Sequence, residues 1–137
     1  MKTFVDSGVL LTAWKREHLA DEALELLADE SREFFSSQMV RLELLPKPRF
    51  EKREREVSFY EAFFASAAAV EPFSPELGRE AETLAGRYGL SGPDALQIAA
   101  ALRHDVQEFY TTEKSTKPMF RVKELRVLSL NSLPRRT

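Results

Sequence analysis

The first eleven residues, MKTFVDSGVLL (residues 1–11), set the pattern of the fold. Apolar residues lie on both sides of one carboxylate, Asp6. A buried strand would not contain Asp6, and a solvated tail would not need its apolar neighbours. The pattern therefore predicts a strand over residues 2–5 that ends at a functional rim, followed by a helix from Ser7 to about Trp14.

Similar units follow along the rest of the chain. Short apolar segments alternate with longer helical segments, separated by capping and turn residues such as Ser74, Pro75 and Gly89. Pro46 and Pro48 are expected to end the helix before them. This alternation is typical of an α/β protein with a parallel sheet. The predicted strands cover residues 2–5, 32–37, 69–73, 108–112 and 123–130, and the predicted helices cover residues 7–14, 19–29, 38–45, 50–67, 74–89 and 90–105.

The composition restricts the class of protein. A length of 137 residues predicts a single domain over 1–137, and 43% hydrophobic with 31% charged residues argues against disorder. The net charge of −2 excludes a surface that is basic overall, so a polyanionic partner would need a local basic patch or a bound metal. The absence of cysteine excludes disulfides and thiolate metal sites. The N-terminus has no signal-peptide pattern and no stretch is long enough to span a membrane, which predicts a cytoplasmic protein without membrane contact.

Four carboxylates fall where strands end or helices begin. Asp6 follows the first strand, Glu43 lies in the helix after the second, Asp94 lies in the first turn of a helix, and Glu113 follows EFYTT. Ligands of parallel sheets bind at the carboxyl ends of the strands, so these acids are expected to converge there.

Each acid also has an ordinary structural explanation. Asp6 could cap a helix, and Asp94 fits a capping box with Ser91. Glu43 could face water, and Glu113 could be a turn residue. The functional interpretation therefore depends on the joint placement of the four acids around one crevice.

Four converging carboxylates would repel one another or take up protons unless a cation lay between them. Oxygen ligands favour Mg²⁺ or Mn²⁺ over zinc. His18 and His104 have no paired spacing and are expected to be surface residues, not ligands. A carboxylate-held Mg²⁺ commonly orients phosphate oxygens, so the sequence predicts hydrolysis of phosphodiesters.

Four segments carry a resemblance to a known family. FVDSGVLL (4–11), SSQMVRLELL (36–45), LSGPDALQIAAAL (90–102) and EFYTTEKS (108–115) resemble, in order, the four motifs of PIN-domain ribonucleases, which include the VapC-type toxins of toxin–antitoxin pairs. The resemblance covers roughly residues 2–130. It implies a PIN-like three-layer sandwich, with a central parallel sheet of four to five short strands flanked by helices. It also implies RNA cleavage that depends on Mg²⁺ or Mn²⁺.

The resemblance assigns roles to individual residues. Asp6, Asp94 and Glu113 correspond to the acids that hold metal, and Glu43 corresponds to the glutamate that positions water or a second ion. The expected products carry 5′-phosphate and 3′-hydroxyl ends. Glu113 departs from the family pattern, which has Asp at this position, often after Asn. The extra methylene moves the carboxylate by about one bond length. This departure is expected to affect the catalytic rate more than the fold.

Two hydroxyl residues, Ser7 and Thr111, match positions beside the acids and are expected to support them through hydrogen bonds. The resemblance further implies an RNA substrate, a homodimer and, if the protein is a toxin, an antitoxin partner.

Four basic residues follow the last acid and could hold RNA phosphates: Lys114, Lys117, Arg121 and Lys123. The basic stretch at residues 47–55 fits either an ion-paired helix or an RNA-guiding lip. The aromatic run VSFYEAFF (57–64) fits a helix buried on two sides or a surface for another chain.

Two other functions compete with the ribonuclease. An aspartyl phosphatase usually needs a second acid two residues after the first, and Gly8 stands there. A PIN-like module that binds RNA or protein without cutting remains open because of Glu113.

Overall fold

A computed structural model describes residues 1–132 and contains a five-stranded sheet. All neighbouring strands are parallel, in the order β3-β2-β1-β4-β5. The parallel α/β sheet predicted from the sequence is therefore confirmed. The strands are β1 (Lys2–Val5), β2 (Glu33–Ser37), β3 (Ala69–Glu71), β4 (Glu108–Thr111) and β5 (Arg126–Ser129).

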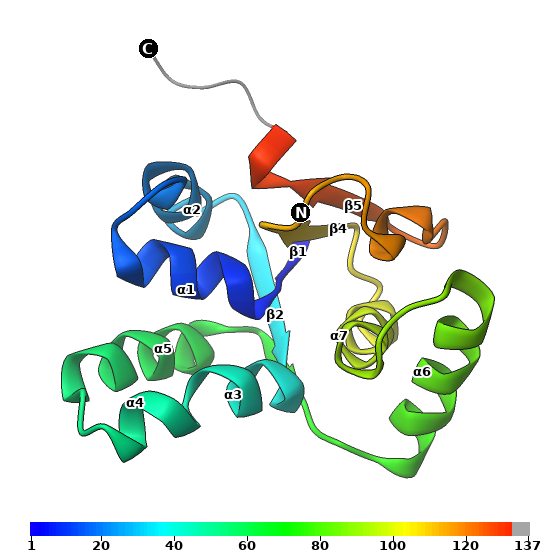
Figure 1. The fold of residues 1–137 in the computed structure, drawn as a ribbon, viewed down its shortest axis with the longest axis horizontal. Coiled ribbons are helices and arrows are strands. Elements are labelled where there is room, and N and C mark those ends of the chain that lie inside the picture. Colours follow the sequence, from blue (N-terminus) through cyan, green and yellow to red (C-terminus); the bar gives the residue numbers. More distant parts are fainter. Residues whose placement is uncertain (133–137) are drawn as a thin grey trace.

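Helices cover both faces of this sheet. In Figure 1, the helices from α1 to α5 lie on one side of the strands, and α6 and α7 lie on the other. The helices are α1 (Ser7–Lys15), α2 (Ala20–Leu27), α3 (Gln38–Leu44), α4 (Pro46–Phe50), α5 (Glu54–Ser66), α6 (Pro75–Tyr88) and α7 (Gly92–Arg103), and two 3₁₀ turns are η1 (Pro118–Arg121) and η2 (Leu130–Ser132). None of the helices within residues 1–132 has the length and apolar character needed to cross a membrane.

The prolines after α3 act differently from the prediction. α3 does end at Leu44, but Pro46 then opens the short helix α4 instead of closing the helical region. A proline at the first position of a helix costs no hydrogen bond, because that N–H has no partner inside the helix. The predicted helix over 50–67 is correspondingly shorter, since α4 and a turn occupy residues 50–53.

The route of the chain through the sheet places a topological switch point beside β1. The chain passes from β1 to β2 and β3 on one side, then crosses to β4 and β5 on the other. The connections that follow β1 and β4 therefore leave the carboxyl ends of these strands in opposite directions along the sheet. Open α/β sheets bind ligands at such a point. The backbone N–H of Asp6 donates to the Tyr110 carbonyl at 3.0 Å and ties the two strand ends together.

Aromatic and small side chains fill the core. Phe4 of β1 stacks on Phe109 of β4 with ring centroids 5.1 Å apart, and both side chains are fully buried. Burial of each ring contributes about 2–3 kcal/mol. The buried face of α7 is rich in alanine, which lets its backbone approach the sheet.

The aromatic run of α5 also packs within the chain. Tyr60 and Phe64 are buried. Phe59 lies against Trp14 at 5.7 Å between ring centroids, and Phe63 lies against Phe34 at 5.9 Å. These contacts match a helix buried on two sides, so packing within the chain is enough to explain the aromatic residues of α5.

Candidate active site

Asp6 occupies the junction between β1 and α1. Its carboxylate caps α1, since Oδ1 accepts a hydrogen bond from the Val9 N–H at 3.2 Å. The residue is also buried, with 7% of its surface exposed. The pKa of Asp6 is raised to about 7. Burial is the largest cause, hydrogen bonds from Thr111 and Val9 act against it, and the charges of Asp94 and Glu113 add smaller upward contributions. A helix cap alone does not require burial beside two other acids.

Asp94 enters the same region from the first turn of α7. Its backbone N–H donates to Ser91 Oγ at 3.3 Å, as the capping prediction requires. Burial raises the pKa of its carboxyl group, and the charge of Glu113 raises it further. Ser91 and the Lys117 ammonium act in the opposite direction. Asp94 therefore lies within electrostatic range of both Asp6 and Glu113.

Glu113 follows the end of β4 and lies on a segment that hydrogen bonds hold in place. Its N–H donates to Thr111 Oγ1 at 3.1 Å, and its carbonyl accepts from the Ser129 hydroxyl. The Thr111 hydroxyl therefore interacts with both Asp6 and the Glu113 backbone. The preceding residue, Thr112, is held through its carbonyl by the Asn131 side chain. These contacts fix the backbone from which the Glu113 side chain projects.

Glu43 reaches the site from α3. Its Oε1 accepts hydrogen bonds from Ser7 Oγ at 3.2 Å and from Gln97 Nε2 at 2.7 Å. Burial raises its pKa, the hydrogen bond from Ser7 lowers it, and the charge of Asp94 raises it. Ser7 thus contacts one of the four predicted acids. Gln97 was not predicted, although it is the one polar residue in the run ALQIAAAL (95–102) and lies one helical turn after Asp94.

A close approach at Gly8 brings two parts of the site together. A Cβ atom at this position would lie 2.5 Å from Thr112 Oγ1 and 3.3 Å from Asp6 Oδ1. Glycine thus allows the segment after β4 to lie against the start of α1.

The site is suited in its chemistry to a hard divalent cation. Its donors are carboxylate oxygens from three elements, which is the ligand type that Mg²⁺ and Mn²⁺ prefer. Burial, and to a smaller extent the charges of Asp94 and Glu113, raise the pKa of Asp6, and a cation bound beside it would favour the ionised carboxylate. Within residues 1–132, however, no three Asp, Glu or His side chains already stand close enough to hold one ion together. The acids therefore fit the metal by type and location, and binding requires their side chains to move toward one another.

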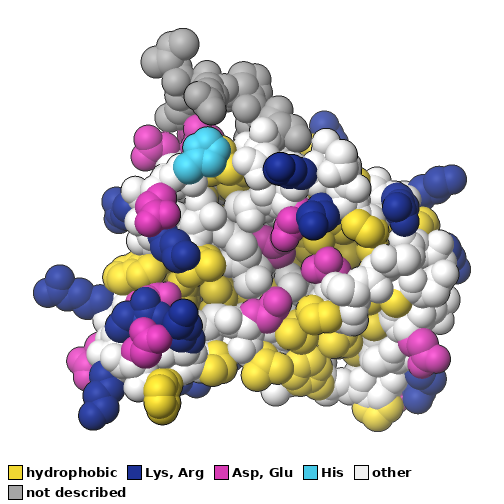
Figure 2. Space-filling model, viewed as in Figure 1, with side chains coloured by type: hydrophobic (Ala, Val, Ile, Leu, Met, Phe, Trp, Pro, Cys, Tyr) yellow, Lys and Arg dark blue, Asp and Glu magenta, His cyan; other side chains and the backbone are white. Residues whose placement is uncertain are grey.

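The surface around these acids carries both signs of charge. Figure 2 shows acidic side chains gathered near the middle of one face, with basic side chains beside them. Two of the basic residues predicted to hold RNA phosphates have contacts within the chain: Lys117 lowers the pKa of Asp94, and the Arg121 guanidinium donates to the Tyr88 carbonyl at 3.1 Å.

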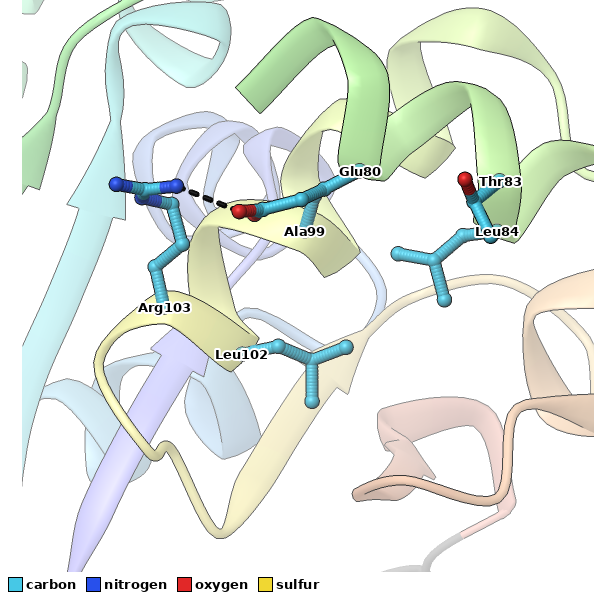
Figure 3. A pocket seen from close by; sticks show the side chains of 6 residues that line it. All are labelled: Glu80, Thr83, Leu84, Ala99, Leu102 and Arg103. Atoms are coloured by element: carbon cyan, nitrogen blue, oxygen red, sulfur yellow. Dashed lines mark hydrogen bonds and ion pairs between the residues drawn. The ribbon is translucent and has the colours of Figure 1, made fainter. Parts of the chain in front are cut away.

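A separate hollow lies between α6 and α7 (Figure 3). It has a volume of about 400 Å³, an apolar floor that includes Leu84 and Leu102, and an ion pair at its rim in which Arg103 Nη1 lies 2.6 Å from Glu80 Oε1. None of the predicted site residues lines it.

The two histidines differ from each other. His18 is exposed, as predicted. His104 is only partly exposed, so it lies at the surface but is more buried than His18. Its ring stacks on Phe35 at 5.2 Å, and its Nε2 lies 3.0 Å from Glu71 Oε2, because the end of α7 packs against the sheet.

Fold and site together define an α/β protein that gathers carboxylates at the switch point of a parallel sheet. The model of the PIN domain matches residues 3–118, and the chain belongs to the PIN domain family. The family resemblance of the four sequence segments is thereby confirmed.

Solved structures share the PIN-like fold. VapBC2 from Rickettsia felis, bound to a promoter DNA fragment, has a TM-score of 0.70 at 20% identity, over 94% of this chain and 98% of that chain. A toxin–antitoxin complex from Klebsiella pneumoniae has a TM-score of 0.70 at 18% identity, over 93% and 97%. VapC20 from Mycobacterium tuberculosis, a toxin that cleaves the sarcin–ricin loop, has a TM-score of 0.69 at 19% identity, over 90% and 98%. No protein with a curated description matches the sequence.

Proposed function

We propose that this protein is a ribonuclease that uses Mg²⁺ or Mn²⁺ to hydrolyse RNA phosphodiester bonds, and that it is the toxin of a toxin–antitoxin pair. The observation that carries the proposal is that Asp6, Asp94 and Glu113 come from separate elements and lie close enough for the charges of Asp94 and Glu113 to act on Asp6, and that of Glu113 on Asp94. Membership of the PIN domain family supports the same activity, because PIN domains are generally metal-dependent nucleases.

In this proposal, Asp6, Asp94 and Glu113 hold the cation. A divalent cation held there would supply Lewis-acid stabilisation of the phosphate charge and would lower the pKa of a nearby water. Glu43 orients the attacking water through Oε2, which takes no hydrogen bond from any residue within the described part of the chain. Water oxygen adds to phosphorus and the bond to the 3′ oxygen breaks, which leaves 5′-phosphate and 3′-hydroxyl ends.

The basic residues beside the acids are suited to the flanking phosphates. Lys117 is exposed and close enough to Asp94 to lower the pKa of its carboxyl group. A phosphate in this position would meet a positive charge next to the acidic side chains. The neighbour from Mycobacterium tuberculosis, which cleaves the sarcin–ricin loop, supports RNA as the substrate.

An antitoxin and a second copy of the chain are the proposed partners. Several neighbours of the same fold are toxin–antitoxin complexes. The proposal predicts growth arrest when the protein is expressed alone and no arrest when the Asp6→Asn variant is expressed. Light scattering of the purified protein is expected to give the mass of a dimer.

Cleavage of a structured RNA with Mn²⁺ tests the activity. Wild type is compared with Asp6→Asn and Asp94→Asn, and Glu30→Gln is the control because Glu30 is an exposed acid in the turn before β2. Wild type and the control are expected to cut equally, and the two site variants are expected to fall to background. Equal cleavage by the site variants contradicts the proposal. RNA binding by wild type without any cleavage favours the module that binds without cutting.

A further inference from the structure

Gln97 is a buried amide in an otherwise apolar part of α7. Only 3% of its surface is exposed, and the neighbouring Ile98, Ala99 and Ala100 are all buried. Placing an amide in such surroundings costs free energy unless hydrogen bonds compensate for the lost water. Leucine or methionine would fill similar space without that cost.

The Gln97 amide makes one strong contact, and it is to Glu43. Gln97 Nε2 donates to Glu43 Oε1 at 2.7 Å and connects α7 to α3 across 54 residues of sequence. A hydrogen bond to a charged group is stronger than one between neutral groups. Ser7 Oγ donates to the same oxygen at 3.2 Å. Side chains of α1 and α7 thus hold Glu43 Oε1, while Glu43 Oε2 accepts no hydrogen bond from any residue in the part of the chain that the structure describes.

The rest of the Gln97 side chain makes no comparable contact. Its Oε1 is buried and has no hydrogen-bond partner among the described residues. A buried acceptor without a partner costs free energy, because it has given up its hydrogen bonds to water. An amide that is only half satisfied is poorly suited to stabilise the fold, so the benefit of Gln97 must come from its contact with Glu43.

The position of Gln97 along α7 couples two acids of the site. Gln97 lies three residues after Asp94, and residues at this spacing share one face of a helix. One rigid helix therefore carries an acid of the cluster and the group that holds Glu43. The relative placement of the two carboxylates depends on this helix.

We propose that Gln97 is a positioning residue that fixes the Glu43 carboxylate relative to Asp94 for RNA cleavage. This inference rests on the proposed function and extends it to a residue outside the acid cluster. A positioning role differs from a packing role in its consequences. Packing alone predicts that substitution of Gln97 lowers stability without a specific loss in the rate of RNA cleavage.

Gln97→Met removes the donor and keeps the length of the side chain. The kcat for RNA cleavage with Mn²⁺ is expected to fall about 10- to 100-fold with little change in KM, as for other groups that orient a reacting residue. Stability in urea without metal is expected to stay the same or to rise, since the unpartnered Oε1 disappears. Leu102→Met, on the same helix beside the hollow of Figure 3, controls for a general change in α7.

A double-mutant cycle with Glu43→Gln tests whether Gln97 affects kcat through Glu43. If Gln97 acts through Glu43, adding Gln97→Met to Glu43→Gln changes kcat less than twofold. The side-chain NH₂ resonances of Gln97 in the metal-free protein are expected to shift on Glu43→Gln and to stay in place on Glu30→Gln. Additive losses in kcat, or unshifted resonances, overturn the positioning role.

The outcomes separate the two proposals. If wild type cleaves RNA and Gln97→Met cleaves equally fast, the positioning role is wrong and the proposed function stands. If Gln97→Met loses rate only in proportion to lost stability, Gln97 is a packing residue. If wild type cleaves no RNA with Mn²⁺, the proposed function is wrong and the positioning role falls with it.

Discussion

Asp6→Asn is expected to make the metal-free protein more stable while removing its function. The pKa of Asp6 is about 7 in the folded protein, against 3.8 for a free Asp side chain. Because the folded value is the higher one, ionisation opposes folding, and stability is lost as the pH rises from about 4 toward 7. A difference of about 3 pKa units corresponds to about 4 kcal/mol once the group is fully ionised.

Asparagine removes the charge and keeps most of the local structure. Its oxygen still accepts from the Val9 N–H, and Asn is a good helix cap. Loss of one of the two hydrogen bonds that the carboxylate accepts costs about 1 kcal/mol. The net stabilisation at pH 8 is therefore about 3 kcal/mol, or about 10 °C in Tm for a chain of this length. At pH 5, where Asp6 is mostly protonated in the folded state, the gain is expected to be below about 1 kcal/mol.

Urea unfolding at pH 5 and pH 8 in EDTA measures this difference, with Glu30→Gln as the exposed control. The control is expected to leave the pH dependence of stability as in wild type. Added Mn²⁺ is expected to stabilise wild type at pH 8 more than the variant, because only wild type keeps the full set of carboxylates. The reasoning is refuted if Asp6→Asn is no more stable than wild type at pH 8, or if its advantage is the same at both pH values.

Two further predictions concern stability. Gly8→Ala is expected to cost about 1–3 kcal/mol, because its Cβ would lie 2.5 Å from Thr112 Oγ1, whereas Gly78→Ala in open space on α6 is expected to gain about 1 kcal/mol. Urea unfolding that shows equal effects at the two glycines would disprove the close approach. Arg32→Met is expected to cost about 3 kcal/mol, because it leaves the Glu108 carboxylate, 8% exposed, without its ion pair. Adding Glu108→Gln should recover much of this loss in the same assay, and no recovery would contradict the pairing.

Much of the fold could be predicted because its signals are local. The apolar residues of β1, the cap and proline at the start of α6, and Gly89 at its end each act over a few residues of sequence. Gly89 has a φ of +72°, which a glycine adopts without strain. The helix α4 was missed because a proline can end one helix or begin the next, and packing against α3 and α5 decides between them.

The location of the acids could also be predicted, since the carboxyl ends of parallel strands share one edge of the sheet. Their detailed contacts could not. The hydrogen bond from Gln97 to Glu43 joins α7 to α3 and depends on how these two helices pack. The burial of His104 against Phe35 likewise depends on the packing of α7 on the sheet. Such contacts between distant segments leave no periodic signal in the sequence.

Anomalous diffraction from crystals soaked in Mn²⁺ tests the central claim most directly. We expect a manganese peak within coordination distance, about 2.2 Å, of carboxylate oxygens from at least two of Asp6, Asp94 and Glu113. Crystals of the Asp6→Asn variant, soaked in the same way, are expected to show a much weaker peak. A wild-type map with no manganese at these three side chains, or with an equal peak in the variant, would contradict the account.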